Sequence, residues 1–123
     1  MPTIDLFARG IRLLPGGEVF DEQRRMTGDM DGWTLAAFQV ATDADVHGDY
    51  WEMHPGGDEL VTVLSGGIRL FLRDEPVTQP VRVGAGEAFI VPRGRWHRIE
   101  LDEPSRLMSL TLRRGTELEK REV

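Results

Sequence analysis

The chain has 123 residues, of which 40% are hydrophobic and 29% are charged, the proportions of one soluble globular domain. Its formal net charge of −6 argues against unaided binding to DNA or RNA, because attraction to phosphates dominates such binding. The sequence has no cysteine, which excludes disulfides and thiolate metal sites, and no membrane-spanning or signal-like apolar segment, so we expect a cytoplasmic protein without a membrane partner.

The first 32 residues differ from the middle of the chain. They carry several glycine and proline breaks, and their apolar residues follow no regular period. We therefore expect residues 1–32 to form an N-terminal arm that packs on the rest of the domain or on a partner subunit.

Residues 33–113 consist of short segments rich in β-branched and aromatic residues, separated by turns that contain Gly or Pro. This pattern is typical of a sandwich or barrel of many short strands. Alternation within residues 68–73 predicts that Ile68, Leu70 and Leu72 point inward. The predicted strands cover residues 33–40, 48–54, 59–64, 68–73, 77–83, 88–91, 96–101 and 106–113.

The end of the chain, residues 114–123, is a tail that is almost wholly charged between Glu117 and Glu122. We expect a frayed helical turn or disorder there and assign it no function. The chain as a whole, residues 1–123, is therefore predicted to be one all-β domain, with its barrel core at 33–113.

Four side chains in the predicted barrel are candidate metal ligands. Glu52 and His54 are two residues apart on one strand, so they project from the same face. Glu59 begins the next strand after a Pro-Gly-Gly turn, and His97 lies on a later strand. Nitrogen and oxygen ligands from three strands are thus expected to converge inside the barrel. His47 has no such pattern around it and is interpreted as a surface residue.

The spacing of these residues resembles the two motifs of a small single-domain cupin. The resemblance implies a double-stranded β-helix, or jelly roll, of about eight or more strands with a pocket at its mouth. The matching positions are His54, Glu59 and Gly66 in the first motif, and Gly86, Pro92, Gly94 and His97 in the second.

The chain departs from the usual motifs at three positions. Val46 and Leu101 replace a Gly and an Asn, and Glu52 replaces a ligand His. The usual set of three His and one Glu thus becomes two of each, which suits a divalent Fe, Mn, Ni or Zn ion. Without a metal, we expect the two carboxylates to share a proton, with the pKa of one of them raised.

These features predict a small metal-dependent enzyme of the dioxygenase, isomerase or lyase type that acts on a small organic or sugar-like acid. Glu52 is either a ligand or the catalytic general base. Arg93, Arg95 and Arg98 cluster near the second motif and are candidates for binding the substrate's carboxylate. The alternative is a non-catalytic sensor module that binds a small molecule without metal.

A homodimer is also expected. Phe71 lies between two arginines on the predicted outer face of its strand, and the N-terminal arm has no obvious place on a single barrel. Both features are commonly explained by pairing with a second copy.

Overall fold

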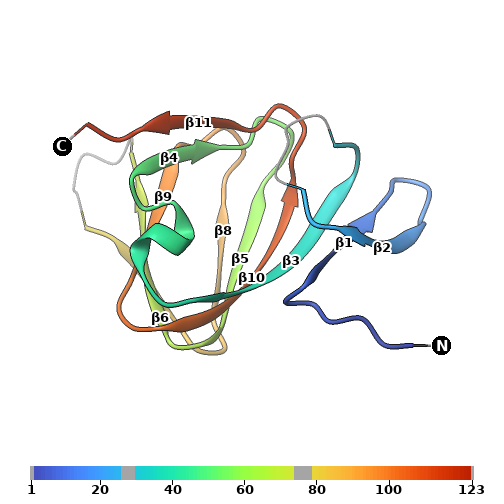
Figure 1. Ribbon diagram of the computed structural model, residues 1–123. Helices are drawn as coiled ribbons and strands as arrows, with labels where there is room; N and C mark the ends of the chain where they lie inside the picture. The colour runs from blue at the N-terminus through green and yellow to red at the C-terminus, as the bar shows by residue number, and fades with distance from the viewer. Residues whose placement is uncertain (1, 26–29, 74–78, 123) are drawn as a thin grey trace.

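The computed structural model describes residues 2–25, 30–73 and 79–122 (Figure 1). Residues 77 and 78, the start of one predicted strand, lie outside this part of the chain. The described residues form eleven strands and one 3₁₀ helix: β1 (Arg9–Leu13), β2 (Val19–Gln23), β3 (Trp33–Val40), η1 (Asp43–Val46), β4 (Tyr50–Met53), β5 (Glu59–Ser65), β6 (Gly67–Leu72), β7 (Val81–Gly84), β8 (Ala88–Val91), β9 (His97–Leu101), β10 (Ser105–Leu112) and β11 (Glu117–Lys120).

The strands form two antiparallel sheets. The six-stranded sheet has the order β2-β1-β3-β10-β5-β8, and the five-stranded sheet has the order β11-β4-β9-β6-β7. Neighbours in a sheet come from distant parts of the chain, as where β3 pairs with β10 along its whole length. The prediction of an all-β jelly roll is confirmed. Among the described residues, no helix has the length and hydropathy needed to cross a membrane.

The hydrophobic core lies between the two sheets. Ile68 and Leu70 are fully buried there, as their alternation predicts, and Leu72 packs against the core while half-buried. Val63 and Val91 meet them from the six-stranded sheet. Each such side chain contributes about 1.5–3 kcal/mol to the free energy of unfolding, so this core holds the sheets that carry the polar end of the barrel.

The predicted N-terminal arm contains a β-hairpin. Strands β1 and β2 pair with each other, and β1 also pairs with β3 through Ile11, Arg12 and Leu13. The hairpin therefore extends the six-stranded sheet beyond the barrel (right side of Figure 1). The backbone carbonyls of Leu6 and Ala37 accept hydrogen bonds from Arg24 at 2.5 and 2.7 Å, which ties the arm to β3.

The expectation for the charged tail is wrong for residues 117–120, which form strand β11. This strand lies along β4 (top of Figure 1) and places Leu118 opposite Glu52. The sequence of β11 has one leucine among charged residues, so it shows almost no alternation of apolar and polar side chains. An edge strand on the surface needs few apolar side chains, which is why the sequence did not predict it. By pairing with β4, β11 covers an edge that would otherwise expose unpaired backbone groups.

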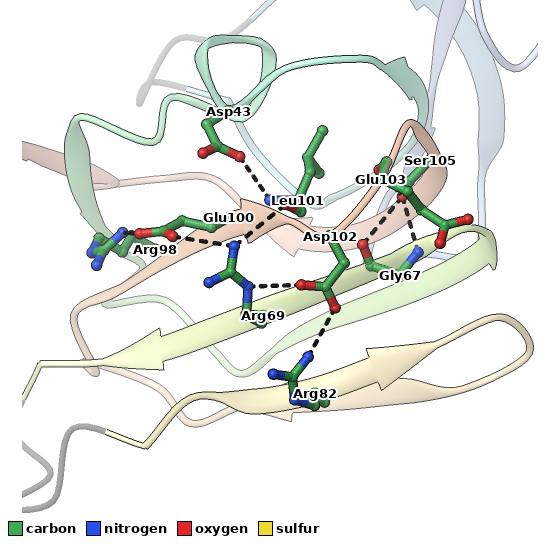
Figure 2. Close-up of polar contacts among 10 residues, drawn as sticks. All are labelled: Asp43, Gly67, Arg69, Arg82, Arg98, Glu100, Leu101, Asp102, Glu103 and Ser105. Atoms are coloured by element: carbon green, nitrogen blue, oxygen red, sulfur yellow. Dashed lines mark hydrogen bonds and ion pairs between the residues drawn. The ribbon is translucent and has the colours of Figure 1, made fainter.

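The outer face of the five-stranded sheet carries a network of charges (Figure 2). Asp102 pairs with Arg69 at 2.7 Å and with Arg82 at 3.2 Å. Within strand β9, Glu100 pairs with Arg98. The charged groups on this face therefore find partners within the chain.

Aromatic rings on the same face are stacked against arginines. The Arg98 guanidinium lies 4.1 Å from the centre of the Phe71 ring. Arg73 lies 4.5 Å from Trp96 and 5.8 Å from Trp51. These contacts are cation–π interactions. They cover Phe71 within one chain, so this residue no longer argues for a dimer.

Candidate metal centre

The four predicted ligands meet at one end of the barrel. Glu52 lies in β4 directly opposite His97, the first residue of β9. His54 follows β4, and Glu59 begins β5 after the turn. Their candidate ligand atoms all lie within 4.8 Å of one another, and all but Glu52 are buried.

Glu59 is the centre of this cluster. Its Oε2 lies 3.1 Å from His54 Nε2, and its Oε1 lies 3.0 Å from His97 Nε2. The hydroxyl of Thr111 donates a hydrogen bond to Oε2 at 2.6 Å. Three groups from three different strands or turns therefore hold one buried carboxylate.

Glu52 is held less firmly. Its Oε1 lies 3.1 Å from His54 Nε2 and 3.7 Å from His97 Nε2, and its side chain is 24% exposed against 6% for Glu59. Its other oxygen, Oε2, lies 3.7 Å from Arg113 Nη2. Glu52 thus faces the two imidazoles with one carboxylate oxygen and Arg113 with the other.

Both imidazoles are oriented by partners outside the cluster. His97 Nδ1 donates to the carbonyl oxygen of Arg95 at 3.2 Å, and His54 Nδ1 lies 2.8 Å from Thr116 Oγ1. Because a carbonyl only accepts, a neutral His97 keeps its proton on Nδ1 and turns the Nε2 lone pair inward. Metal-binding histidines are typically fixed in this way.

The charges of the cluster alter its protonation. Burial alone would lower the pKa of His54, but hydrogen bonds and charge attraction from Glu52 and Glu59 raise it to about 9. Burial would also lower the pKa of His97, but the hydrogen bond and charge of Glu59, together with the charge of Glu52, raise it. Burial would raise the pKa of both carboxyl groups, but the imidazoles outweigh it and lower both.

The expectation of a proton shared between the two carboxylates is therefore wrong. Repulsion between the two carboxylates favours a shared proton, but the two histidines beside them outweigh it. Each imidazole is a stronger base than either carboxylate in this geometry, so without a metal the protons reside on His54 and His97.

The donor set fits a divalent cation. Two carboxylates and two neutral imidazoles carry a charge of about −2, which a divalent ion neutralises within a buried site. The ligand atoms converge from all four side chains, and the imidazoles present Nε2 inward. The structure therefore supports a candidate metal site, with the ion's identity open among Fe, Mn, Ni and Zn.

A pocket opens beside the cluster. Its non-protein space is about 780 Å³, a figure that includes open solvent at the mouth. Glu52, Glu59 and His97 contribute to its lining. The exposed His47 borders it near the mouth, so the expected surface histidine lies at the edge of the site. The walls are mainly apolar and include Phe38, Val46, Val61, Ile99 and Leu107.

The three arginines expected to bind substrate do not converge on this pocket. Arg93 is exposed, and it bonds Asp58 through its backbone N–H and the Gly56 carbonyl through its guanidinium, each at 2.8 Å. Arg95 presents its carbonyl to His97. Arg98 borders the pocket, while its guanidinium stacks on Phe71. Their role in binding substrate stays a prediction.

Three residues at the site were not predicted from the sequence: Thr111, Arg113 and Thr116. Thr111 and Arg113 are both buried, and Arg113 lines the pocket. A signal for them exists, because a period of two that starts at Leu107 places Thr111 and Arg113 on the inward face. Thr116 lies in the turn before β11, a strand that the sequence did not predict.

A barrel of two antiparallel sheets with a His and Glu cluster at one end defines the class of protein. The cupin-domain family model matches residues 39–111. Since this match covers more than half of the chain, the protein belongs to the cupin family, as the motif spacing predicts.

Solved structures show the same fold. A cupin-2 domain protein from Shewanella frigidimarina has a TM-score of 0.50 and 22% identity, over 79% of this chain and 78% of that chain. A cupin superfamily protein from Desulfitobacterium hafniense has a TM-score of 0.53 and 20% identity, over 72% and 73%. A mutant of Bacillus subtilis oxalate decarboxylase has a TM-score of 0.50 and 17% identity, over 72% of this chain and 23% of that chain. No curated protein matches the chain.

The raised pKa of His54 predicts how the stability of the metal-free protein depends on pH. A group whose pKa is higher in the folded state stabilises that state fully below its unfolded pKa of 6.5, and the effect is lost as the pH rises through about 9. Chelator-treated protein should therefore lose roughly 3 kcal/mol of unfolding free energy across this range. Urea titrations at several pH values measure it.

The matched control is His47→Gln, because His47 is exposed and belongs to no cluster in the described residues. This variant should keep the pH dependence, whereas His54→Gln should reduce it to the smaller part that His97 contributes. Equal slopes in His54→Gln and the unmodified protein would contradict the assignment of the protons to the imidazoles.

Proposed function

We propose that the protein is a metal-dependent cupin enzyme that acts on a small organic or sugar-like acid held between the two sheets. The observation that carries the proposal is the buried cluster of Glu52, His54, Glu59 and His97 at the wall of a pocket. A divalent ion there would supply Lewis-acid chemistry, or redox chemistry if it is iron.

The two carboxylates are suited to different roles. Glu59 is buried and is fixed by Thr111 and both imidazoles, which suits a permanent ligand. Glu52 is partly exposed and borders the pocket, so its carboxylate can reach a bound molecule. We propose that Glu52 completes the ligand set and also accepts a proton from the substrate as the general base.

The reaction class follows from the ion. Iron would favour oxidation by a dioxygenase route, whereas manganese, nickel or zinc would favour an isomerase or lyase route. In each case the chain's own contribution is the same. The cluster orients the substrate, the apolar walls exclude water from it, and Glu52 holds or moves a proton.

One observation favours the alternative, a sensor module that binds a small molecule without metal. Two protonated imidazoles and two ionised carboxylates balance to a net charge of zero, and they hydrogen-bond one another. The cluster is therefore electrostatically satisfied without an ion. A tightly retained organic ligand in protein that takes up no metal would support this function.

The proposal predicts about one Fe, Mn, Ni or Zn per chain by elemental mass spectrometry on protein purified without chelator or added metal. His54→Gln and His97→Gln should lose most of it, because each removes a buried nitrogen ligand. Glu52→Gln distinguishes the two roles of that residue: loss of metal makes it a required ligand, while retained metal with turnover reduced by about 100-fold or more makes it the base.

Turnover is measured by product profiling of a panel of small organic and sugar acids, with oxygen uptake recorded in parallel. Arg82→Gln is the control, since Arg82 is exposed on the far side of the five-stranded sheet. Metal content that stays unchanged in both histidine variants would contradict the proposed site.

We also infer that the protein is a homodimer that pairs through the outer face of its six-stranded sheet. Four apolar residues on neighbouring strands lie opposite one another and form a row across this face: Leu35, Leu110, Leu60 and Ile90. Ile90 is 60% exposed. A sheet face that meets water is normally polar, and this neutral row lets two chains of like charge approach each other about a two-fold axis.

Light scattering in solution should therefore give twice the chain mass of 13.9 kDa. Ile90→Glu should give monomers, because a charge opposite its symmetry mate is costly to bury. Val19→Glu is the matched control, since Val19 is 62% exposed but lies on the hairpin. A monomeric unmodified protein, or dimers that persist in Ile90→Glu, would contradict the interface.

A further inference from the structure

Arg113 lines the pocket, and its guanidinium makes no hydrogen bond shorter than 3.5 Å to the described residues. Its side chain is 9% exposed, and its Nε is buried without a partner. The nearest carboxylate oxygen, Glu52 Oε2, lies 3.7 Å from Nη2, beyond a normal hydrogen bond. Arg113 lines the pocket together with Glu52 and His97.

A second buried arginine, Arg12, shows how both terminal guanidinium nitrogens find partners in this fold, although its Nε is likewise buried without a partner. The Arg12 side chain is 7% exposed, similar to Arg113. It donates to the Asp31 carbonyl at 2.8 Å and to Glu22 at 2.5 Å. Arg113 has no equivalent partners among the described residues. A buried guanidinium with unmade hydrogen bonds destabilises the folded chain, so an anion from outside the chain is a suitable partner.

Glu52 cannot fill this role alone. Its Oε1 is engaged by His54 at 3.1 Å, and a carboxylate bound to the cluster shares its charge there. A planar guanidinium offers parallel donors that match the two oxygens of a carboxylate. A carboxylate bound to Arg113 would lie beside Glu52 and the cluster, where a substrate must lie to react.

The charge of the site selects the anion. A divalent ion with Glu52, Glu59 and two neutral imidazoles sums to about zero, and Arg113 adds one positive charge. A monoanion neutralises this total, whereas a dianion leaves an uncompensated charge against apolar walls. Asp45 also borders the pocket, but it is exposed and accepts hydrogen bonds from the backbone of Ala41 and Thr42.

The walls select the rest of the molecule. Most of the exposed pocket surface is hydrocarbon, from residues such as Phe38, Val61, Ile99 and Leu107; besides the cluster and Arg113, the polar lining residues are Asp45, His47, Tyr50, Arg98 and Ser109. A polyhydroxylated body would leave most of its hydroxyl groups without partners against these walls, at a cost for each one. The pocket therefore suits a hydrocarbon body and disfavours a sugar.

We propose that the ligand of this pocket is a small monocarboxylate with a hydrocarbon body, and that Arg113 binds its carboxylate. The inference rests on the proposed function, which it narrows from organic or sugar-like acids to one class. It also transfers the carboxylate-binding role from Arg93, Arg95 and Arg98 to a residue inside the pocket.

The test compares acids with their isosteric amides by calorimetry and ligand-detected NMR. Butanoate and benzoate are titrated into the unmodified protein beside butanamide and benzamide, with succinate and gluconate as dianion and sugar-acid probes. Each acid should bind about tenfold or more tightly than its amide, because hydrogen bonds to charged groups are worth about 1.5–3 kcal/mol. Succinate and gluconate should bind more weakly than butanoate.

Variants then assign the effect to Arg113. Arg113→Gln should make acid and amide bind alike, and Arg113→Lys should keep a reduced preference, because it retains the charge without the fork. Arg82→Gln should leave the preference intact. If Arg113→Gln fails to fold, binding of acid and amide by Arg113→Lys and by the unmodified protein still tests whether Arg113 binds the carboxylate.

Equal binding of acid and amide, a preference that survives Arg113→Gln, tighter binding of succinate or gluconate, or no binding of either monocarboxylate at millimolar concentration would each overturn the inference. Its failure is separable from that of the proposed function. A carboxylate preference in protein that takes up no metal supports this inference and removes the enzyme. Bound metal with no preference does the reverse.

Discussion

The interaction on which the site depends is the bridge that Glu59 makes between two imidazoles. Its two oxygens lie 3.1 Å from His54 and 3.0 Å from His97, and Thr111 donates to one of them. These residues come from the turn after β4 and from β5, β9 and β10. The core between the sheets must therefore bring these strands into register for the bridge to exist, so the fold and the candidate metal centre are coupled.

Substituting Glu52 for the usual ligand histidine changes the electrostatics of that bridge. With a second carboxylate beside it, each imidazole has an anionic neighbour, and the pKa of both is raised. Protons and a divalent ion thus compete for the same four side chains. The site remains charge-balanced in either case, which makes it tolerant of metal loss. A positive residue, Arg113, stands outside this balance and gives the pocket its preference for an anion.

The sequence predicts the parts of the structure that obey local rules. Alternation places Ile68 and Leu70 in the core, and motif spacing places His54, Glu59 and His97 together. It fails where tertiary contacts decide the outcome. Strand β11 is hidden in a charged tail because it forms only by pairing with β4. Arg98 directly follows the inward-facing His97 on β9, so strand alternation turns it outward, and only its stacking on Phe71 depends on tertiary contacts.

The most direct test of the account is a calorimetric titration of metal into chelator-treated protein at neutral pH, in buffers of different ionisation enthalpy. Because a pKa raised to about 9 keeps His54 protonated at neutral pH, and the pKa of His97 is also raised, a bound ion must displace protons from the cluster. The account predicts one ion per chain with release of about one proton or more, and loss of both signals in His54→Gln. Failure of Fe, Mn, Ni and Zn alike to bind, or binding without proton release, would contradict it.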